Sequence, residues 1–136
     1  MRVLVDTSVW IDFFSGRPDP AASALARLID DEADVLTCGL VAAELLQGVR
    51  RDRQRATIER HLRDMEWLTP REPHTYLAAA ELFRTLRARG VTIRSTVDCI
   101  IAQLAAENGT LLLAHDKDLS AIVKSGLLDV EMLPTS

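Results

Sequence analysis

Short apolar runs alternate along this chain with longer segments that carry apolar residues at helical spacing. The runs 2–5, 34–37, 110–114 and 130–133 are short and rich in Val and Leu, which predicts buried strands. Apolar spacing, capping residues and glycines predict helices that begin at Thr7 or Ser8 and then cover 21–33, 40–48, 52–64, 74–89, 97–107 and 117–124. Strands that alternate with helices predict a mostly parallel sheet covered on both faces, a three-layer α/β/α sandwich.

The composition fits one folded domain spanning residues 1–136. Hydrophobic residues make up 48% of the chain and charged residues 26%, and no repeat or linker interrupts it. No apolar run approaches the about 20 residues of a membrane span, and the early Asp6 breaks any signal-peptide pattern. We therefore expect a cytoplasmic protein with no membrane partner. Cys38 and Cys99 lack CxxC spacing, so we expect small buried apolar side chains rather than zinc ligands.

Charge is unevenly distributed along the chain. The net charge is −4, which argues against a nucleic-acid partner if the charges are spread evenly. Residues 50–94, however, contain eleven arginines and six acidic residues, a net charge of +5, and the remainder carries −9. A basic middle with acidic ends is consistent either with solvated helix faces or with a phosphate-facing surface beside an acidic site.

Five acidic residues occupy the positions where predicted strands end and predicted helices begin. The carboxyl ends of parallel strands meet at one edge of a sheet, and the following helices start there. Asp6 closes the first strand, Glu44 lies one turn into the helix after the second strand, and Asp98 lies in the first turn of the helix 97–107. Asp116 and Asp118 follow the strand 110–114. We therefore expect all five carboxylates to converge.

Converging carboxylates must be neutralised. Two of them ~5 Å apart repel by roughly 3 kcal/mol at an effective dielectric constant of about 20. Either some hold protons or a divalent cation binds, and oxygen ligands without Cys or His suit Mg²⁺ or Mn²⁺. Such a site favours phosphodiester hydrolysis, with Glu44 or Asp98 orienting the attacking water. The structural alternative is that Asp98 favours its helix dipole, Asp6 caps a helix, and Asp116 and Asp118 occupy a turn.

Four segments that contain these acids resemble the PIN-domain ribonucleases in order and spacing, and specifically the VapC toxins. They are 5–12 (VDTSVWID), 41–48 (VAAELLQG), 97–102 (VDCIIA) and 113–118 (LAHDKD). The resemblance covers essentially the whole chain. It implies a PIN-like fold and an Mg²⁺- or Mn²⁺-dependent endoribonuclease toxin that cuts structured RNA such as tRNA or rRNA. It also implies inhibition by a VapB antitoxin and a homodimer, with the helices after Glu44 or near 74–89 as contact faces.

The resemblance also assigns site residues. It implies a catalytic set of Asp6, Glu44, Asp98 and Asp116, with Thr7 or Ser8 as a hydroxyl near the metal. The implied metal ligands are Asp6, Asp98, Asp116 and Asp118, of which Asp118 occupies a position where family members vary.

Arginines near these segments are candidate RNA ligands. Arg50, Arg51 and Arg53, followed by Arg55, precede or open a helix and are placed to hold RNA phosphates or to aid solubility. Arg94 lies four residues before Asp98, within reach of a scissile phosphate. The three histidines lack partners at metal-ligand spacing, so we expect surface or packing roles for His61, His74 and His115.

The first predicted helix carries more large apolar residues than one inward stripe accommodates. Most of Trp10, Phe13 and Phe14 are expected in the core, and one or two are expected to form a groove with Leu45 and Leu46 for an antitoxin helix.

Two other classes of protein, one of enzymes and one of signalling domains, fit the sequence poorly. A haloacid-dehalogenase-like phosphatase needs Asp-x-Asp after its first strand, and a receiver domain needs an acidic pair there. The alternative function is a non-catalytic PIN-like module that binds RNA or protein.

Overall fold

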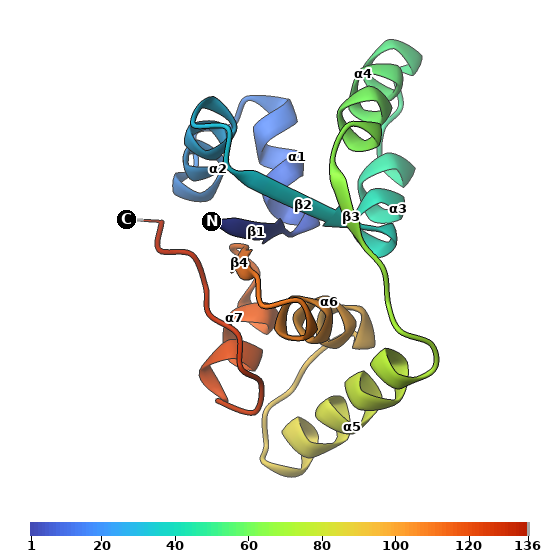
Figure 1. The fold of residues 1–136 in the computed structure, drawn as a ribbon, viewed down its shortest axis with the longest axis vertical. Helices are drawn as coiled ribbons and strands as arrows, with labels where there is room; N and C mark the ends of the chain where they lie inside the picture. Colours follow the sequence, from blue (N-terminus) through green and yellow to red (C-terminus); the bar gives the residue numbers. More distant parts are fainter. Residues whose placement is uncertain (136) are drawn as a thin grey trace.

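A four-stranded parallel sheet forms the centre of the molecule (Figure 1), which a computed structural model describes for residues 1–135. Its strand order is β3-β2-β1-β4, with the bounds β1 (Arg2–Val5), β2 (Asp34–Cys38), β3 (Glu66–Leu68) and β4 (Leu111–Leu113). Leu4 of β1 pairs with Leu36 on one side and Leu112 on the other. These three side chains are fully buried, as expected for strands covered on both faces.

Helices cover the sheet on both sides, which confirms the predicted three-layer sandwich. Figure 1 shows α1, α2 and α4 on one side of the sheet and α5, α6 and α7 on the other, while α3 contacts α1 and α4. The helices are α1 (Thr7–Ser15), α2 (Pro20–Asp30), α3 (Gly39–Gln47), α4 (Asp52–Arg63), α5 (His74–Ala88), α6 (Thr96–Glu107) and α7 (Lys117–Lys124).

Side-chain caps fix where several helices begin. Asp6 accepts the N–H of Ser8 at the start of α1, and Asp19 accepts the N–H groups of Ala21 and Ala22 at the start of α2. Asp116 caps α7 in the same way. Two of the expected site acids, Asp6 and Asp116, therefore hold helix starts at the carboxyl edge of the sheet.

Three details of the predicted secondary structure were wrong. The expected strand 130–133 is reduced to a single bridge between Met132 and Leu112, in which Leu112 donates its N–H to Glu131 and Leu133 donates its N–H to Leu112. The expected helix 21–33 ends at Asp30, because the backbone of Glu32 has a positive φ of 55°, which lies outside the right-handed helical region. The edge strand β3 was not predicted, because its first two residues are exposed and its sequence has no clear alternation.

The two cysteines are buried and free, as predicted. No helix within residues 1–135 is long and apolar enough to cross a membrane.

Candidate active site

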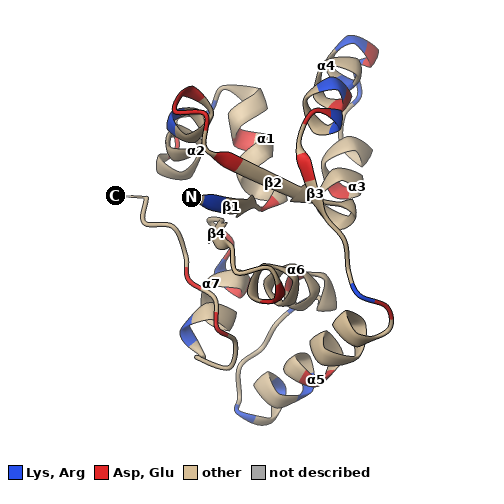
Figure 2. Ribbon diagram, viewed as in Figure 1, with Lys and Arg blue, Asp and Glu red and all other residues tan. Residues whose placement is uncertain are grey.

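The five expected acids meet at the carboxyl edge of the sheet. The backbone N–H of Asp6 donates to the carbonyl of Leu113 at 2.9 Å, which joins the ends of β1 and β4. One carboxylate oxygen from each of Asp98, Asp116 and Asp118 lies within 4.8 Å of the other two. Figure 2 shows acidic segments where β4, α6 and α7 meet, near the end of β1. Residues that are far apart in the sequence thus form one acidic cluster.

Two hydroxyl groups donate hydrogen bonds to carboxylates of this cluster. The Oγ of Ser8 donates to Oδ2 of Asp6 at 2.8 Å, and the Oγ1 of Thr7 donates to Oε1 of Glu44 at 3.0 Å. Both hydroxyls therefore hold an acidic side chain in a fixed orientation. Thr7 and Asp6 are buried, so these contacts are shielded from competing water.

Burial and mutual repulsion disfavour charge in this cluster. Burial is the largest cause that raises the pKa of Asp98 to about 7, and the charges of Asp116, Asp6, Asp118 and Glu44 add to it. Burial also raises the pKa of Asp6; hydrogen bonds from Ser8 and Thr7 oppose this effect, and the charge of Asp116 reinforces it. The four carboxylates whose charges raise the pKa of Asp98 are the four other predicted site acids, so the cluster acts as one electrostatic unit.

The raised pKa of Asp98 predicts that the protein loses stability as pH rises when divalent cations are chelated. Between its ordinary pKa of 3.8 and about 7, folded Asp98 holds a proton that the unfolded chain releases, so the free energy of unfolding falls with pH. Wild type should lose about 1–2 kcal/mol in the free energy of unfolding between pH 5 and pH 8 because of Asp98, and Asp98→Asn should not show this loss. Urea denaturation of both proteins in EDTA measures it; parallel stability curves would contradict the shift.

Arg94 binds one acid of the cluster. Its backbone N–H and its Nε both donate to Oδ2 of Asp118, each at 3.1 Å. The backbone N–H of Arg94 is the largest cause that lowers the pKa of Asp118 below its ordinary value. Asp118 is therefore ionised and paired, in contrast to Asp98.

A second group of possible metal ligands lies next to the cluster. His115 places Nε2 3.0 Å from Oδ2 of Asp12, and ligand atoms of Asp12, Asp19 and His115 lie within 4.8 Å of one another. The expectation that His115 has no partner at metal-ligand spacing was therefore wrong. Arg17 lies 3.6 Å from the other oxygen of Asp12, so this buried carboxylate already has two basic partners. Asp12 is the last residue of the segment 5–12, but no local sequence pattern predicts its contact with His115.

The other two histidines take the expected surface and packing positions. The ring of His61 packs edge-on against Phe14, and His74 lies 3.9 Å from Glu107 at the surface.

The acidic cluster fits a divalent cation better than the second group does. Its donors are all carboxylate oxygens, which Mg²⁺ and Mn²⁺ prefer, and burial together with the charges of the neighbouring carboxylates raises the pKa of Asp98. The group of Asp12, Asp19 and His115 instead contains an imidazole and has the guanidinium of Arg17 beside it.

An apolar groove of about 330 Å³ lies between α1, α3 and α4 and reaches Glu44. Its lining includes Phe14 and Leu45, as expected, and Ile11, which is 44% exposed. Trp10 is instead buried and stacks on Phe14. The other expected residues, Phe13 and Leu46, are partly buried against the core.

Arginines border the groove. Arg50 and Arg51 line it directly, and Arg53 is exposed on α4, whose basic residues appear blue in Figure 2. The basic segment therefore lies on the same side of the molecule as Glu44.

Comparison with known proteins assigns the family. A model of the PIN domain matches residues 3–125, so the chain belongs to the PIN-domain family. It is 33% identical over 123 residues to Ribonuclease VapC11 of Mycobacterium tuberculosis and to a VapC ribonuclease of Mycobacterium bovis. These matches cover 90% of this chain and 92% of each relative.

Solved structures share the fold. VapBC2 from Rickettsia felis, bound to promoter DNA, gives a TM-score of 0.71 at 20% identity and covers 98% of this chain and 100% of that one. VapC20 from Mycobacterium tuberculosis, described as a sarcin-ricin loop cleaving toxin, gives a TM-score of 0.64 at 20% identity. The match covers 95% of this chain and 98% of that one.

Proposed function

We propose that this chain, as a single PIN domain over residues 1–136, is a divalent-metal-dependent endoribonuclease toxin of the VapC type. The observation that carries the proposal is the convergence of Asp6, Glu44, Asp98 and Asp116 from separate elements into one acidic cluster. The relatives named as VapC ribonucleases support the same activity. Of the proposed domain, Ser136 lies outside the described residues.

Asp6, Asp98 and Asp116 would hold Mg²⁺ or Mn²⁺. When bound, the cation would lower the pKa of a coordinated water and offset the negative charge that develops on the phosphate during hydrolysis. Oδ2 of Asp118, the fourth expected ligand, accepts hydrogen bonds from the backbone N–H and the Nε–H of Arg94.

In this proposal, Glu44 orients the attacking water. Thr7 holds its Oε1, and within the described chain Oε2 accepts no hydrogen bond. A carboxylate fixed through one oxygen can accept a proton through the other. Ser8 has the corresponding task at Asp6, where it fixes the carboxylate orientation.

The substrate in this proposal is structured RNA such as tRNA or rRNA. Arg50, Arg51 and Arg53 would contact its phosphates along the groove that leads to Glu44. The description of VapC20 as a toxin that cleaves the sarcin-ricin loop supports an RNA of this class.

The partner in this proposal is a VapB-type antitoxin. Structures of VapBC complexes are among the neighbours of this chain. An antitoxin helix would place apolar side chains on Ile11, Phe14 and Leu45. The protein would act in the cytoplasm as a homodimer. The contact face would be the helix after Glu44 or the helix α5, on which Tyr76 and Leu77 are exposed.

Metal removal tests the proposed activity. The purified protein should cleave a structured RNA in Mg²⁺ or Mn²⁺, lose cleavage in EDTA and regain it when the cation is restored, because the carboxylates alone cannot offset the charge of the reacting phosphate. Gel analysis of end-labelled RNA measures this. RNA binding without cleavage under any of these conditions would instead support a non-catalytic binding module.

A further inference from the structure

Asp118 differs from the other acids of the cluster in being paired with a base. Among residues 1–135, Arg94 is the one basic residue that forms an ion pair with any of the five clustered acids. The pair links the loop before α6 to the first turn of α7, and therefore crosses the edge of the site. Asp118 also donates its backbone N–H to Oδ1 of Asp116 at 2.7 Å.

We infer that Asp118 anchors Arg94 over the acidic cluster and is not a metal ligand, so that the Arg94 guanidinium receives the scissile phosphate. This inference rests on the proposed nuclease function. It makes Asp118 a positioning residue, which acts on the RNA through Arg94.

The charge balance of the site requires such a cation. Five ionised carboxylates and one divalent cation leave a net charge of −3, which repels an incoming phosphate. Arg94 reduces this excess at the point where Asp98, Asp116 and Asp118 meet. A guanidinium also suits the position, because its planar donors match two phosphate oxygens.

The geometry leaves the outer part of Arg94 available. Its bond to Asp118 uses only Nε, and within residues 1–135 neither terminal nitrogen of the guanidinium makes a hydrogen bond. The Arg94 side chain is 76% exposed, whereas the Asp118 side chain is 12% exposed. A buried carboxylate thus holds the inner edge of an exposed guanidinium, and the two terminal nitrogens remain for an RNA phosphate.

The anchoring oxygen is also poorly suited to a metal. Oδ2 of Asp118 accepts the cationic Nε–H of Arg94 as well as its backbone N–H, so its charge already has a positive partner. Asp6 and Asp116 also accept two donors on one oxygen, but those donors are neutral hydroxyl and backbone N–H groups. Asp6, Asp98 and Asp116 form no ion pair with a basic residue among the described residues. The cation therefore has most to gain at Asp6, Asp98 and Asp116.

A double-mutant cycle tests the anchor in the full chain. Asp118→Asn, Arg94→Ala and the double variant are compared with wild type for cleavage of one structured RNA in Mg²⁺ and for Mn²⁺ affinity by calorimetry. Each single variant should lose about 10- to 100-fold in kcat/KM, and the double variant should lose no more than the worse single variant. Mn²⁺ affinity should stay unchanged in the double variant, which loses one negative and one positive charge, and should change much less in the single variants than in Asp98→Asn, the reference, which should weaken it about tenfold or more.

Chemical rescue separates anchoring from a loss of structure. Added methylguanidinium should restore part of the cleavage by Arg94→Ala, in which Asp118 remains, but not by the double variant. The inference is overturned if Asp118→Asn weakens Mn²⁺ binding as much as Asp98→Asn does, or if the two losses multiply. Arg94→Ala keeps the backbone bond to Asp118, so it remains decisive if Asp118→Asn unfolds. Failure of wild type to cleave RNA refutes the proposed function instead, and the Mn²⁺ affinities still decide whether Asp118 is a ligand.

Discussion

Replacing Asp98 with asparagine is expected to abolish RNA cleavage and to leave the protein as stable as wild type, or more stable, at pH 8. Asparagine keeps the shape of the side chain but removes the charge that the cation needs, so the rate should fall by about 1,000-fold or more. It also removes a carboxylate repelled by four neighbours. Asp6→Asn should behave in the same way, because burial disfavours its charge too. Single-turnover RNA cleavage and thermal unfolding measure the two effects.

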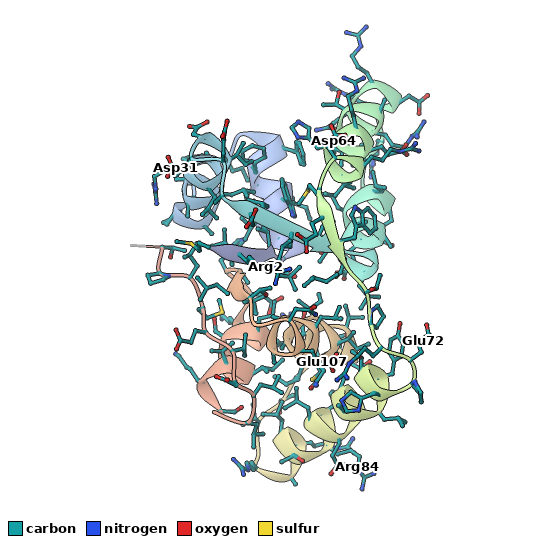
Figure 3. The ribbon with its side chains drawn as sticks, viewed as in Figure 1. Arg2, Asp31, Asp64, Glu72, Arg84 and Glu107 are labelled. Atoms are coloured by element: carbon teal, nitrogen blue, oxygen red, sulfur yellow. The ribbon has the colours of Figure 1, made fainter. Side chains whose placement is uncertain are left out.

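A matched variant separates site chemistry from net charge. Asp31→Asn makes the same charge change at the exposed end of α2, and Figure 3 shows Asp31 well away from α6. It should cleave RNA at the wild-type rate. If the double variant Asp6→Asn/Asp98→Asn cleaves at that rate as well, the acidic cluster is not the catalytic site.

Replacing Ile11 with asparagine is expected to release the enzyme from its antitoxin while RNA cleavage continues. Ile11 is a large exposed apolar residue of the groove, and a polar amide there would lose the apolar contact with an antitoxin helix. Replacing a residue of this kind at the centre of an interface makes the binding free energy less favourable by about 2 kcal/mol or more, which raises Kd roughly 30-fold. Because asparagine is neutral, the electrostatics of the acidic cluster should not change. Titration of a VapB-type helix into the protein measures the loss.

Ile29→Asn provides the control for this groove. Ile29 is exposed to a similar degree, on α2, and lines a different cavity. It should bind the helix as wild type does. Equal loss of binding in both variants would show that the helix does not occupy the groove between α1, α3 and α4.

The sequence was sufficient to predict the strands β1, β2 and β4 and the acidic cluster, because these follow from local patterns. Each acid stands at a fixed place relative to a strand end or a helix start, and parallel topology brings those places together. Asp6 and Asp116 illustrate this most directly, since each caps the helix that follows its strand.

Contacts between segments that are distant in the sequence could not be predicted in the same way. Asp118, in the first turn of α7, lies 24 residues from Arg94, in the loop before α6, and no periodicity relates the two segments. The pair of Asp12 and His115 has the same character, with one residue on α1 and the other beside β4. The strand β3 depends on the pairing of Leu68 with Cys38 rather than on its own pattern.

The double duty of Asp6 and Asp116 has a practical consequence for choosing inactive versions of this protein. Each side chain starts a helix through its oxygen as well as belonging to the acidic cluster. Alanine at either place would uncap a helix, at a cost of about 1 kcal/mol, and would mix misfolding with lost chemistry. Asparagine retains a capping oxygen, so an inactive variant made with it should keep the native fold and can be used to trap RNA or the antitoxin.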